Sequence, residues 1–468
     1  MRRFVCVSSL CLLTACVVGP EYQPPSMSVP QTWQNGVSST ESTIPDEWWQ
    51  AFHDEDLNRL VNDALVANLD LKQAILRVAQ ARILRKETIA SGLPSLSAKN
   101  LATQRFNNSS AGGGGISMNG QPINIFQLGF DAQWELDFFG GIQRAVEAAD
   151  ASIGIEIENS RDARLTLVGE VVKAYLIVRQ NQTVQKTYQL MLASQNEGLM
   201  LLDSRARSGF ATALELSQAK TQYENTRANL PYYDTEIKKG IHALGVLLGR
   251  EPTALTTLLL TTQPSVPAVA EPFKLALPSE LLQRRPDIRR AERQMALANA
   301  SVGIATAALY PKIDLAGFIG FQNLKITDFT PIGKSWSTAS TVTLPLFNWG
   351  KLQANIADKD LQYQAAFLAY QSTVLTAFQE VENALVTLGH LQQRQHSLRQ
   401  AVAFSEDALQ LTQKRYASGL THFMDVLQAQ QTLYQVQIQQ IESMSAVAQS
   451  NVALFKALGG GYAQMPAE

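Results

Sequence analysis

Two short stretches of this 468-residue chain carry the same charged side chains at the same spacing. In each, an Arg stands four residues before a Gly and an acid stands six residues after it: Arg205, Gly209 and Glu215, then Arg415, Gly419 and Asp425. Gly permits a turn that a Cβ would penalise, and an acid shortly after such a turn is ordinary capping chemistry for the next helix. Neither stretch has a nucleophile beside a base or a set of metal ligands. The pattern predicts two equivalent polar turns.

The rest of the chain gives little support for an enzyme or a nucleic-acid binder. The five histidines show no HExxH motif and no pair at ligand spacing, and no GxSxG motif occurs. The net charge is −2, whereas nucleic-acid binders usually carry a basic excess. We therefore expect no enzyme, no metal site and no nucleic-acid partner.

The two turns belong to a longer duplication. Asp70 matches Asp287 at an offset of 217 residues, and Gly209 matches Gly419 at an offset of 210. The difference falls where the first copy carries the glycine-rich stretch "NNSSAGGGGISMNG". The chain is therefore predicted to be two copies of one unit.

Each copy contains a very long helical segment before its turn. Residues 141–206 and 351–416 lack proline, and 66 residues of helix reach about 100 Å at ~1.5 Å per residue. In the second segment apolar residues step by four and three, which is a coiled-coil rhythm: Val374, Phe378, Val381, Leu385 and Leu388. A returning helix follows each turn, and Pro231 is expected to kink or interrupt the first one.

Each copy also contains two candidate strands, at about 95–105 and 124–138, and at about 312–323 and 335–347. The stretch "NIFQLGFDAQWELDFF" alternates strictly, with Phe126 and Trp134 on an apolar face and Asp131 and Glu135 on a polar one. An apolar face with aromatic residues near both ends suits a strand that crosses a membrane, which needs roughly 9–11 residues.

Four strands cannot close a barrel, and open sheet edges are not tolerated in hydrocarbon. Identical chains must then supply the missing strands. Two chains would give eight strands, enough for a barrel filled by side chains, and three would give twelve, which leaves a lumen. Because Asp131 and Glu135 favour a wet interior, we expect them to line the lumen of a pore.

The amino terminus reads as an export signal. Arg2 and Arg3 precede an apolar run, and Leu13-Thr14-Ala15-Cys16 has the layout of a bacterial lipobox. We expect residues 1–15 to be removed and Cys16 to carry an N-acyl and an S-diacylglycerol group, with no other cofactor. Val17, where inner-membrane retention would use Asp, favours the outer membrane. No run of 18 apolar residues is present, so no transmembrane helix is expected.

Long stretches of the sequence resemble a known family. They are "CVVGPEYQPP", "WWQAFHDEDLNRLVNDALVANLDLKQAILRVAQAR", "RRPDIRRAERQMALANASVGIATAALYP", "LPLFNWGK" and "RYASGLTHFMDVLQAQQTLY". Together they resemble the outer membrane factor family, the TolC-like channels of tripartite efflux pumps, and most closely its lipoprotein branch that serves RND-type pumps. The resemblance extends from Cys16 to about Gly460.

The resemblance implies an α plus membrane β-barrel fold, with two repeats of helix–strand–strand–long helix–helix. A homotrimer would form one 12-stranded β-barrel continuous with a 12-helix periplasmic α-barrel. The expected divisions are a lipid-anchored equatorial segment (16–53), repeat 1 (54–249), an equatorial linker (250–279), repeat 2 (280–458) and a tail (459–468). The implied partners are other copies of the chain, a periplasmic membrane-fusion adaptor, an inner membrane RND pump and outer membrane lipid.

By the same resemblance, the two polar turns lie at the periplasmic tip, which closes the resting channel and meets the adaptor. The implied gate or aperture residues are Glu215, Asp425, Gln428, Met424 and Tyr416. The implied turn and adaptor-contact residues are Arg205, Ser208, Gly209, Arg415, Ser418 and Gly419. A ring of acids at a narrow mouth would attract cations and repel anions.

This chain departs from the family at the gate. It has Gln428 where the family often carries another acid, and Thr421 where some members have a basic residue. Closure by hydrogen bonding through Tyr416 and by apolar contact of Met424 is then the expected substitute for salt bridges. The alternative reading of Glu215 and Asp425 is that they only cap helices.

The expected function is a passive duct that carries drugs or toxic small molecules from an RND pump, through an adaptor, across the outer membrane of a Gram-negative bacterium. The alternatives are a conduit for heavy-metal export or type I protein secretion and, from another class, a pore-less lipid-anchored coiled-coil tether. The sequence specifies neither the substrate nor the particular pump and adaptor.

Overall fold

The computed structural model describes residues 17–34, 45, 47–105, 123–261, 264–269, 278–325 and 333–460. They divide into two compact units. Unit 1 draws on Met1–Pro25, Val78–Glu156 and Ala291–Tyr370, and unit 2 draws on Ser26–Arg77, Ile157–Arg290 and Gln371–Glu468. Within the described residues, no helix combines the length and hydropathy needed to cross a membrane.

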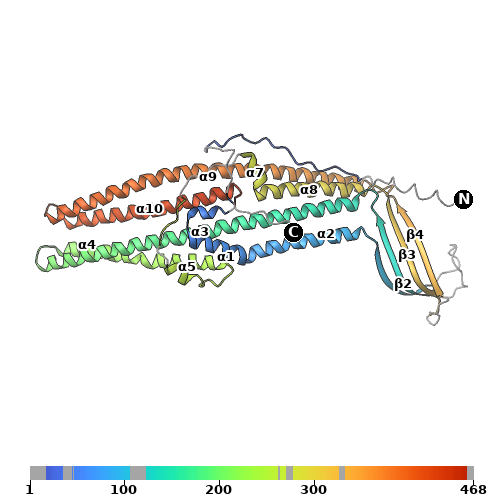
Figure 1. Ribbon diagram of the computed structural model, residues 1–468, viewed down its shortest axis with the longest axis horizontal. Coiled ribbons are helices and arrows are strands. Elements are labelled where there is room, and N and C mark those ends of the chain that lie inside the picture. The colour runs from blue at the N-terminus through green and yellow to red at the C-terminus, as the bar shows by residue number, and fades with distance from the viewer. Residues whose placement is uncertain are drawn as a thin grey trace. The chain divides into compact units, whose positions relative to one another are not determined.

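Unit 1 contains one antiparallel sheet whose strands follow the chain order β1-β2-β3-β4 (Figure 1). The strands are β1 (Ser95–Arg105), β2 (Ile123–Leu136), β3 (Lys312–Asn323) and β4 (Lys334–Thr343). The register places Asp131 opposite Ser97 on one side and Phe318 on the other. Residues of β2 therefore alternate between a polar face, with Asp131 and Glu135, and an apolar face.

β4 ends at Thr343, four residues before the end that the sequence pattern indicated, and β2 ends at Leu136 instead of 138. Pro345 accounts for the first difference, because proline cannot donate a hydrogen bond to the ladder. Residues 137–139 turn the chain into the next helix, and the Asp137 carboxylate accepts a hydrogen bond from the Gln143 backbone N at 2.8 Å.

Two helices of 67 residues follow the strand pairs: α3 (Gly141–Arg207) and α9 (Lys351–Ala417). α2 (Leu69–Ser91) and α8 (Pro286–Ala307) lead into the sheet. In each half of the chain the order is thus helix, strand, strand, long helix and returning helix, which confirms the predicted repeat of elements. In α9, Val374 and Val381 are fully buried and Leu385 nearly so, as the coiled-coil rhythm predicts.

The two returning helices differ. After the second turn, α10 (Phe423–Ala457) is continuous. After the first, α4 (Ala213–Ala228) ends and α5 (Leu230–Leu247) begins, with Pro231 near the start of α5. This break confirms the predicted interruption. Pro231 is tolerated in the first turn of α5, where a backbone N–H would have no hydrogen-bond partner in the helix.

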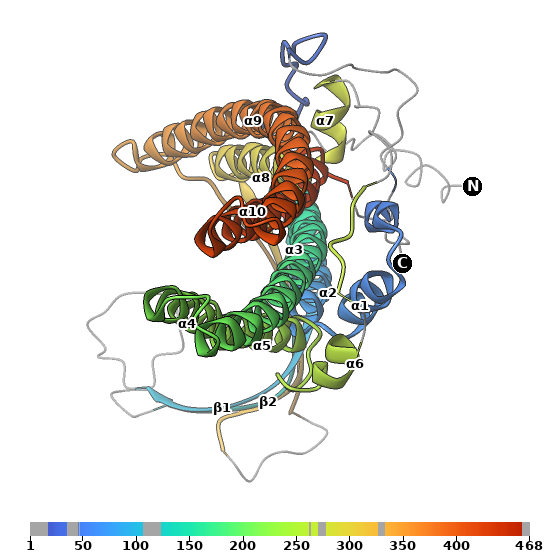
Figure 2. The ribbon, with the colours of Figure 1, turned by 90° about the vertical axis from the view of Figure 1, so that its left-hand side faces the viewer.

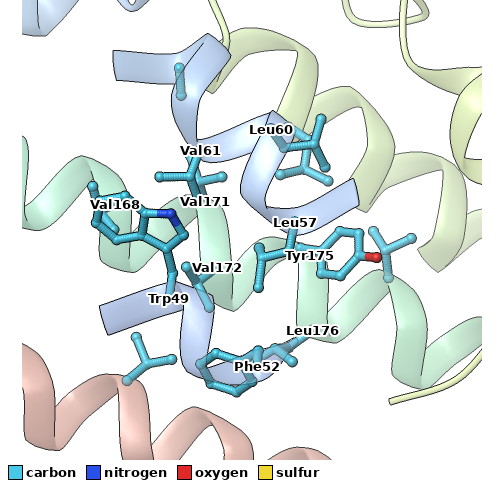
Figure 3. Close-up of a cluster of buried hydrophobic side chains, with 14 of the residues drawn as sticks. Trp49, Phe52, Leu57, Leu60, Val61, Val168, Val171, Val172, Tyr175 and Leu176 are labelled. Carbon is cyan, nitrogen blue, oxygen red and sulfur yellow. The ribbon is translucent and has the colours of Figure 1, made fainter. Parts of the chain in front are cut away.

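The core of unit 2 gathers segments from before, within and after the first repeat onto α3 (Figure 3). η1 (Trp48–Phe52) and α1 (Glu55–Ala67) pack Trp49 and Leu57 against Val171 and Val172 of α3. α6 (Thr256–Thr261) adds Leu259 to the same core.

A buried polar network accompanies this core. Arg179 of α3 is 2% exposed and donates to the Tyr175 phenol oxygen at 2.9 Å and to Asp56 at 3.2 Å. The phenol in turn donates to Asp54, which caps α1. Burial is the main cause that raises the pKa of Tyr175 well above its usual value, so the phenol stays a donor.

Two equivalent joints in unit 2 bring the end of a returning helix to the start of a helix from the same repeat. The Asn68 side chain donates to the Leu247 carbonyl of α5 at 2.8 Å and accepts from Leu71 N of α2 at 2.8 Å. In the second repeat, Arg285 follows α7 (Pro278–Arg284) and donates to the Ala457 carbonyl of α10 at 2.9 Å. Each joint therefore satisfies carbonyls that a helix end leaves unpaired.

The joint in the second repeat is charged. Arg285 also binds Asp287 and, at 2.7 Å, Glu380 of α9. Burial would raise the pKa of the Asp287 carboxyl, but the hydrogen bonds and charge of Arg285 hold it below its usual range.

The first described residues form a strap across unit 1. Arg144 of α3, 4% exposed, donates to the carbonyls of Val18 at 3.1 Å and Gly19 at 3.2 Å. Gly19 has a φ of +91°, and a Cβ there would lie 2.6 Å from the Gly303 Cα of α8. Further along, Tyr22 donates to the Glu292 carboxylate at 3.0 Å. The strap is thus held by built contacts along its length.

Candidate functional site

The two polar turns have the same backbone construction. Gly209 and Gly419 have φ values of +77° and +70°, and a Cβ at either would meet nothing within 4 Å. Their conformation, not lack of space, therefore explains the glycine. Phe210 N donates to the Arg205 carbonyl at 2.8 Å, and Leu420 N donates to that of Arg415 at 2.9 Å. Both long helices thus end in a Schellman motif.

Serines complete these turns locally. The Ser208 hydroxyl donates to the Ser204 carbonyl at 3.0 Å, and the Ser418 hydroxyl donates to the Lys414 carbonyl at 3.1 Å. Both serines are exposed, as are Gly209 and Gly419. The surface of each turn is therefore available to a partner while its backbone is satisfied.

Both acids cap the helices that follow the turns. Glu215 accepts from the Thr212 backbone N at 2.8 Å and the Thr212 hydroxyl at 2.9 Å, and Thr212 caps Glu215 N in return. Asp425 accepts from the Thr421 hydroxyl and from His422 N at 3.1 Å. These bonds hold the pKa of each carboxyl below its usual value, so both are charged at neutral pH.

The capping bonds give the acids the local role that sequence reasoning kept as the alternative. They leave open the aperture role, which depends on other copies of the chain and stays a prediction. The Thr421 hydroxyl donates a hydrogen bond to the Asp425 carboxylate.

A bond across the two halves of the chain joins the turns. Arg205 at the end of α3 donates to the Tyr416 phenol oxygen at 2.6 Å, and its guanidinium carbon lies 4.9 Å from the centroid of the Tyr416 ring. The Tyr416 ring also packs against Phe423, and a Cβ at Gly198 of α3 would lie 3.2 Å from Cζ of Phe423. Arg415, the repeat equivalent of Arg205, is exposed.

Sequence reasoning named Arg205 and Tyr416 but did not pair them. The signal was a break in the repeat, because position 206, the equivalent of Tyr416, is Ala. A tyrosine that occurs in only one copy of the repeat cannot make the same contact in both copies, so its partner has to be sought in the other copy.

The remaining gate candidates differ in environment. Met424 packs at the edge of a small core formed by Leu202, Ala219, Phe423 and Leu427. Gln428 is exposed and lines, with Asp425 and Phe404, a groove of about 350 Å³ between α9 and α10, which lie side by side in Figure 2. Exposed apolar side chains stand near the turns, among them Phe210 at 84% and Leu420 at 68%.

In the sheet, Asp131 and Glu135 are both ion-paired on the polar face. Lys99 lies 3.2 Å from Asp131, and Lys312 lies 3.0 Å from Glu135. The opposite face exposes large apolar side chains, including Leu128, Phe130 and Ile319, which are 49%, 53% and 65% exposed.

Two expectations concern features beyond this site. Cys16 lies outside the described residues. Within the described parts of the chain, no group of three His, Cys, Asp or Glu side chains is placed to hold a metal ion.

Comparison with known proteins places the chain in a family. Its sequence matches the outer membrane efflux protein family over residues 60–250 and 277–460. It is 31% identical to the outer membrane protein OprJ of Pseudomonas aeruginosa, over 96% of this chain and 94% of that protein. It is 30% identical to the solvent efflux pump outer membrane protein SrpC of Pseudomonas putida, over 97% of each.

Solved structures of outer membrane channels have the same fold as this chain. The outer-membrane channel OprN superposes with a TM-score of 0.88 at 29% identity, covering 95% of this chain and 99% of that one. CusC superposes with a TM-score of 0.82 at 26% identity, covering 95% and 100%. These are TolC-like channels and not enzymes, which confirms the predicted fold class. The chain is a member of the outer membrane efflux protein family.

Proposed function

We propose that three copies of this chain form a passive duct across the outer membrane, which exports toxic small molecules. The observation that carries the proposal is the four-stranded sheet with one polar, ion-paired face and one exposed apolar face. β1 and β4 are each paired on one side only, so each chain offers two strand edges to its neighbours. Edge-to-edge pairing of three copies gives twelve strands and a water-filled lumen.

The two faces of the sheet indicate which side of the barrel faces lipid and which faces the lumen. Leu128, Phe130 and Ile319 turn apolar surface outward, which costs free energy in water and none in lipid. Asp131 and Glu135, with their lysine partners, face the water inside. The long helices α3 and α9 and their returning helices continue the duct into the periplasm.

The energy for transport comes from partners. The proposed duct receives cargo from an inner membrane RND pump through a periplasmic adaptor. The names of relatives include solvent efflux, pyoverdine export and cation efflux, the last for CusC at 28% identity. We assign this chain to drugs and other toxic organic molecules, in line with relatives such as SrpC.

The periplasmic tip is proposed as both gate and docking surface. The exposed turns at Gly209 and Gly419, flanked by Phe210 and Leu420, are the surface for the adaptor. The bond between Arg205 and Tyr416 holds the two hairpins of one copy together, and Glu215 and Asp425 set the charge of the mouth.

The lipid anchor is proposed at Cys16. The strap supports it, because Val18 N donates to the Phe139 carbonyl at 3.2 Å, next to the end of β2. The chain therefore enters the described structure at the end of the sheet where a membrane surface would lie.

Single-channel recording in planar lipid bilayers, together with the mass of the detergent-solubilised protein, tests the function. A duct predicts a trimer with long-lived open conductance once the tip is opened or removed. A monomer that never conducts, in preparations with native sheet content by circular dichroism, would support the pore-less tether instead. Loss of acylation in Cys16→Ser, measured by mass spectrometry, tests the anchor separately.

A further inference from the structure

Phe318 is the one aromatic side chain on the polar face among the described strand residues. The register places it in a cross-strand row between Asp131 and Ser337. An aromatic ring in this position needs an explanation, because its neighbours on the same face are mostly charged, hydroxylated or small.

The neighbouring row explains how the ring is held. Gly129 of β2 lies directly opposite Gly320 of β3. A Cβ at Gly129 would lie 2.6 Å from Cε2 of Phe318, and a Cβ at Gly320 would lie 2.8 Å from Cζ. The far edge of the ring therefore occupies the space that two side chains would take.

This geometry means that the ring lies along the sheet instead of standing up from it. Paired glycines in strands leave backbone uncovered, and an aromatic ring that covers them restores packing. The same Cβ positions come within 2.7 Å of the opposite backbone, so the two strands approach closely at this pair. Gly129 and Gly320 together form a seat for Phe318.

We infer that Phe318 sets the width of the duct at this level, and that its glycine seat keeps the ring flat against the wall. The inference rests on the proposed function, in which the polar face lines the passage. In a closed trimer, one ring from each copy lies at the same height. A ring that left its seat would project into the lumen and narrow it.

Cysteine substitution tests where residue 318 points. The natural cysteines are Cys6, Cys11 and Cys16 only, so Phe318→Cys in the acylated protein adds one free thiol per copy. A bulky, water-soluble methanethiosulfonate reagent should then lower the single-channel conductance stepwise, by roughly a quarter or more in total. Phe321→Cys is the matched control, because it replaces an aromatic of the same strand on the opposite face and should show no change.

A second set of variants tests the seat. Gly320→Ala should displace the ring and lower the conductance, although its Cβ would also lie 2.5 Å from the Gly129 Cα. Recovery of the conductance in the double variant Gly320→Ala with Phe318→Ala would assign the loss to the ring and not to the backbone. Gly317→Ala is the control, because a Cβ there meets its nearest atoms at 3.9 Å and 4.0 Å. If the backbone contacts at Gly320 prevent assembly of the variant, the comparison of Phe318→Cys with Phe321→Cys tests the role of Phe318 by itself.

The outcomes separate the two proposals. Phe318→Cys channels that conduct and are indifferent to the reagent, or that respond no more than Phe321→Cys channels, would overturn the role of Phe318 and leave the duct intact. Protein that forms no channel even after its tip is opened or removed would refute the duct itself.

Discussion

Arg205 and Tyr416 come from the two halves of a duplicated chain, and the guanidinium of one donates to the phenol oxygen of the other at 2.6 Å. The bond is asymmetric, because neither Arg415 nor Ala206 repeats it. It ties the end of α3 to the end of α9 next to both turns. A gate that opens by separating these hairpins must break it.

Tyr416→Phe removes this bond and keeps the ring and its packing on Phe423. A hydrogen bond from a charged donor at a half-exposed site stabilises by about 1 kcal/mol, so the open population should rise roughly fivefold. Open probability in planar bilayers measures this. Tyr223→Phe, in α4 and away from this bond, serves as a phenol-to-phenyl control. Equal open probability for wild type and Tyr416→Phe would remove the bond from the gate.

Glu215→Gln separates the capping role of this residue from its charge. Glutamine can still accept from Thr212 as the acid does in a capping box, so the fold of the turn should persist. If three such carboxylates line the mouth, the variant should have a weaker cation preference, because only Asp425 remains, seen as a shift in reversal potential under a salt gradient. Glu215→Ala should lose both properties. Unchanged selectivity in Glu215→Gln would confine the residue to capping.

The sequence predicted the long helices, the duplication and the strands because each depends on local pattern: proline-free stretches, matched offsets and strict alternation along β2. The contacts between distant segments of one repeat escaped prediction. Asn68 and Arg285 stand at equivalent positions, each two residues before an aspartate, Asp70 or Asp287. No local pattern predicts that each side chain binds the last carbonyl of a helix that ends some 170–180 residues away.

The sequence also left the role of Glu215 and Asp425 undecided. Their spacing was equally compatible with a cap and with an aperture, because both need a carboxylate just after a turn. Only the folded structure shows that Thr212 and Thr421 donate to them. The seat of Phe318 likewise requires the cross-strand register, which alternation within one strand does not fix.

Arg285→Met tests the charged joint. The change leaves the Asp287 carboxylate and the Ala457 carbonyl without their main donor in a largely buried place, a loss on the order of 3 kcal/mol. We expect a lower midpoint of thermal unfolding by circular dichroism. Arg284→Met is the neighbouring control, because the Arg284–Glu280 pair at 3.3 Å is partly exposed and contributes little. Equal midpoints for the two variants would contradict a structural role for the joint.

The same joint predicts a pH dependence. The folded-state pKa of Asp287 lies below its usual 3.8, so its contribution is present above that value and is lost as the pH falls through the folded pKa. As the pH falls below about 4, wild-type protein should lose more thermal stability than Arg285→Met, in which the pairing is already absent. Parallel curves for the two proteins over this range would show that acid destabilises the protein elsewhere.

The strap offers the last prediction, because it can be cut. Glu21 is exposed, between Pro20, whose carbonyl accepts from Asn299 at 3.0 Å, and Tyr22. A glutamate-specific protease should therefore cleave wild-type protein slowly at Glu21, because the segment must first leave α3 and α8.

Gly303→Val places a side chain against Arg144, whose Cδ and Cγ lie 2.8 Å from a Cβ at that position. Losing the bonds of the buried Arg144 should speed cleavage roughly tenfold. Gly389→Ala, with nothing within 4 Å of its Cβ, should cleave like wild type. Fast cleavage of all three proteins would show that the strap is not held by these contacts, since its release would then be independent of Arg144.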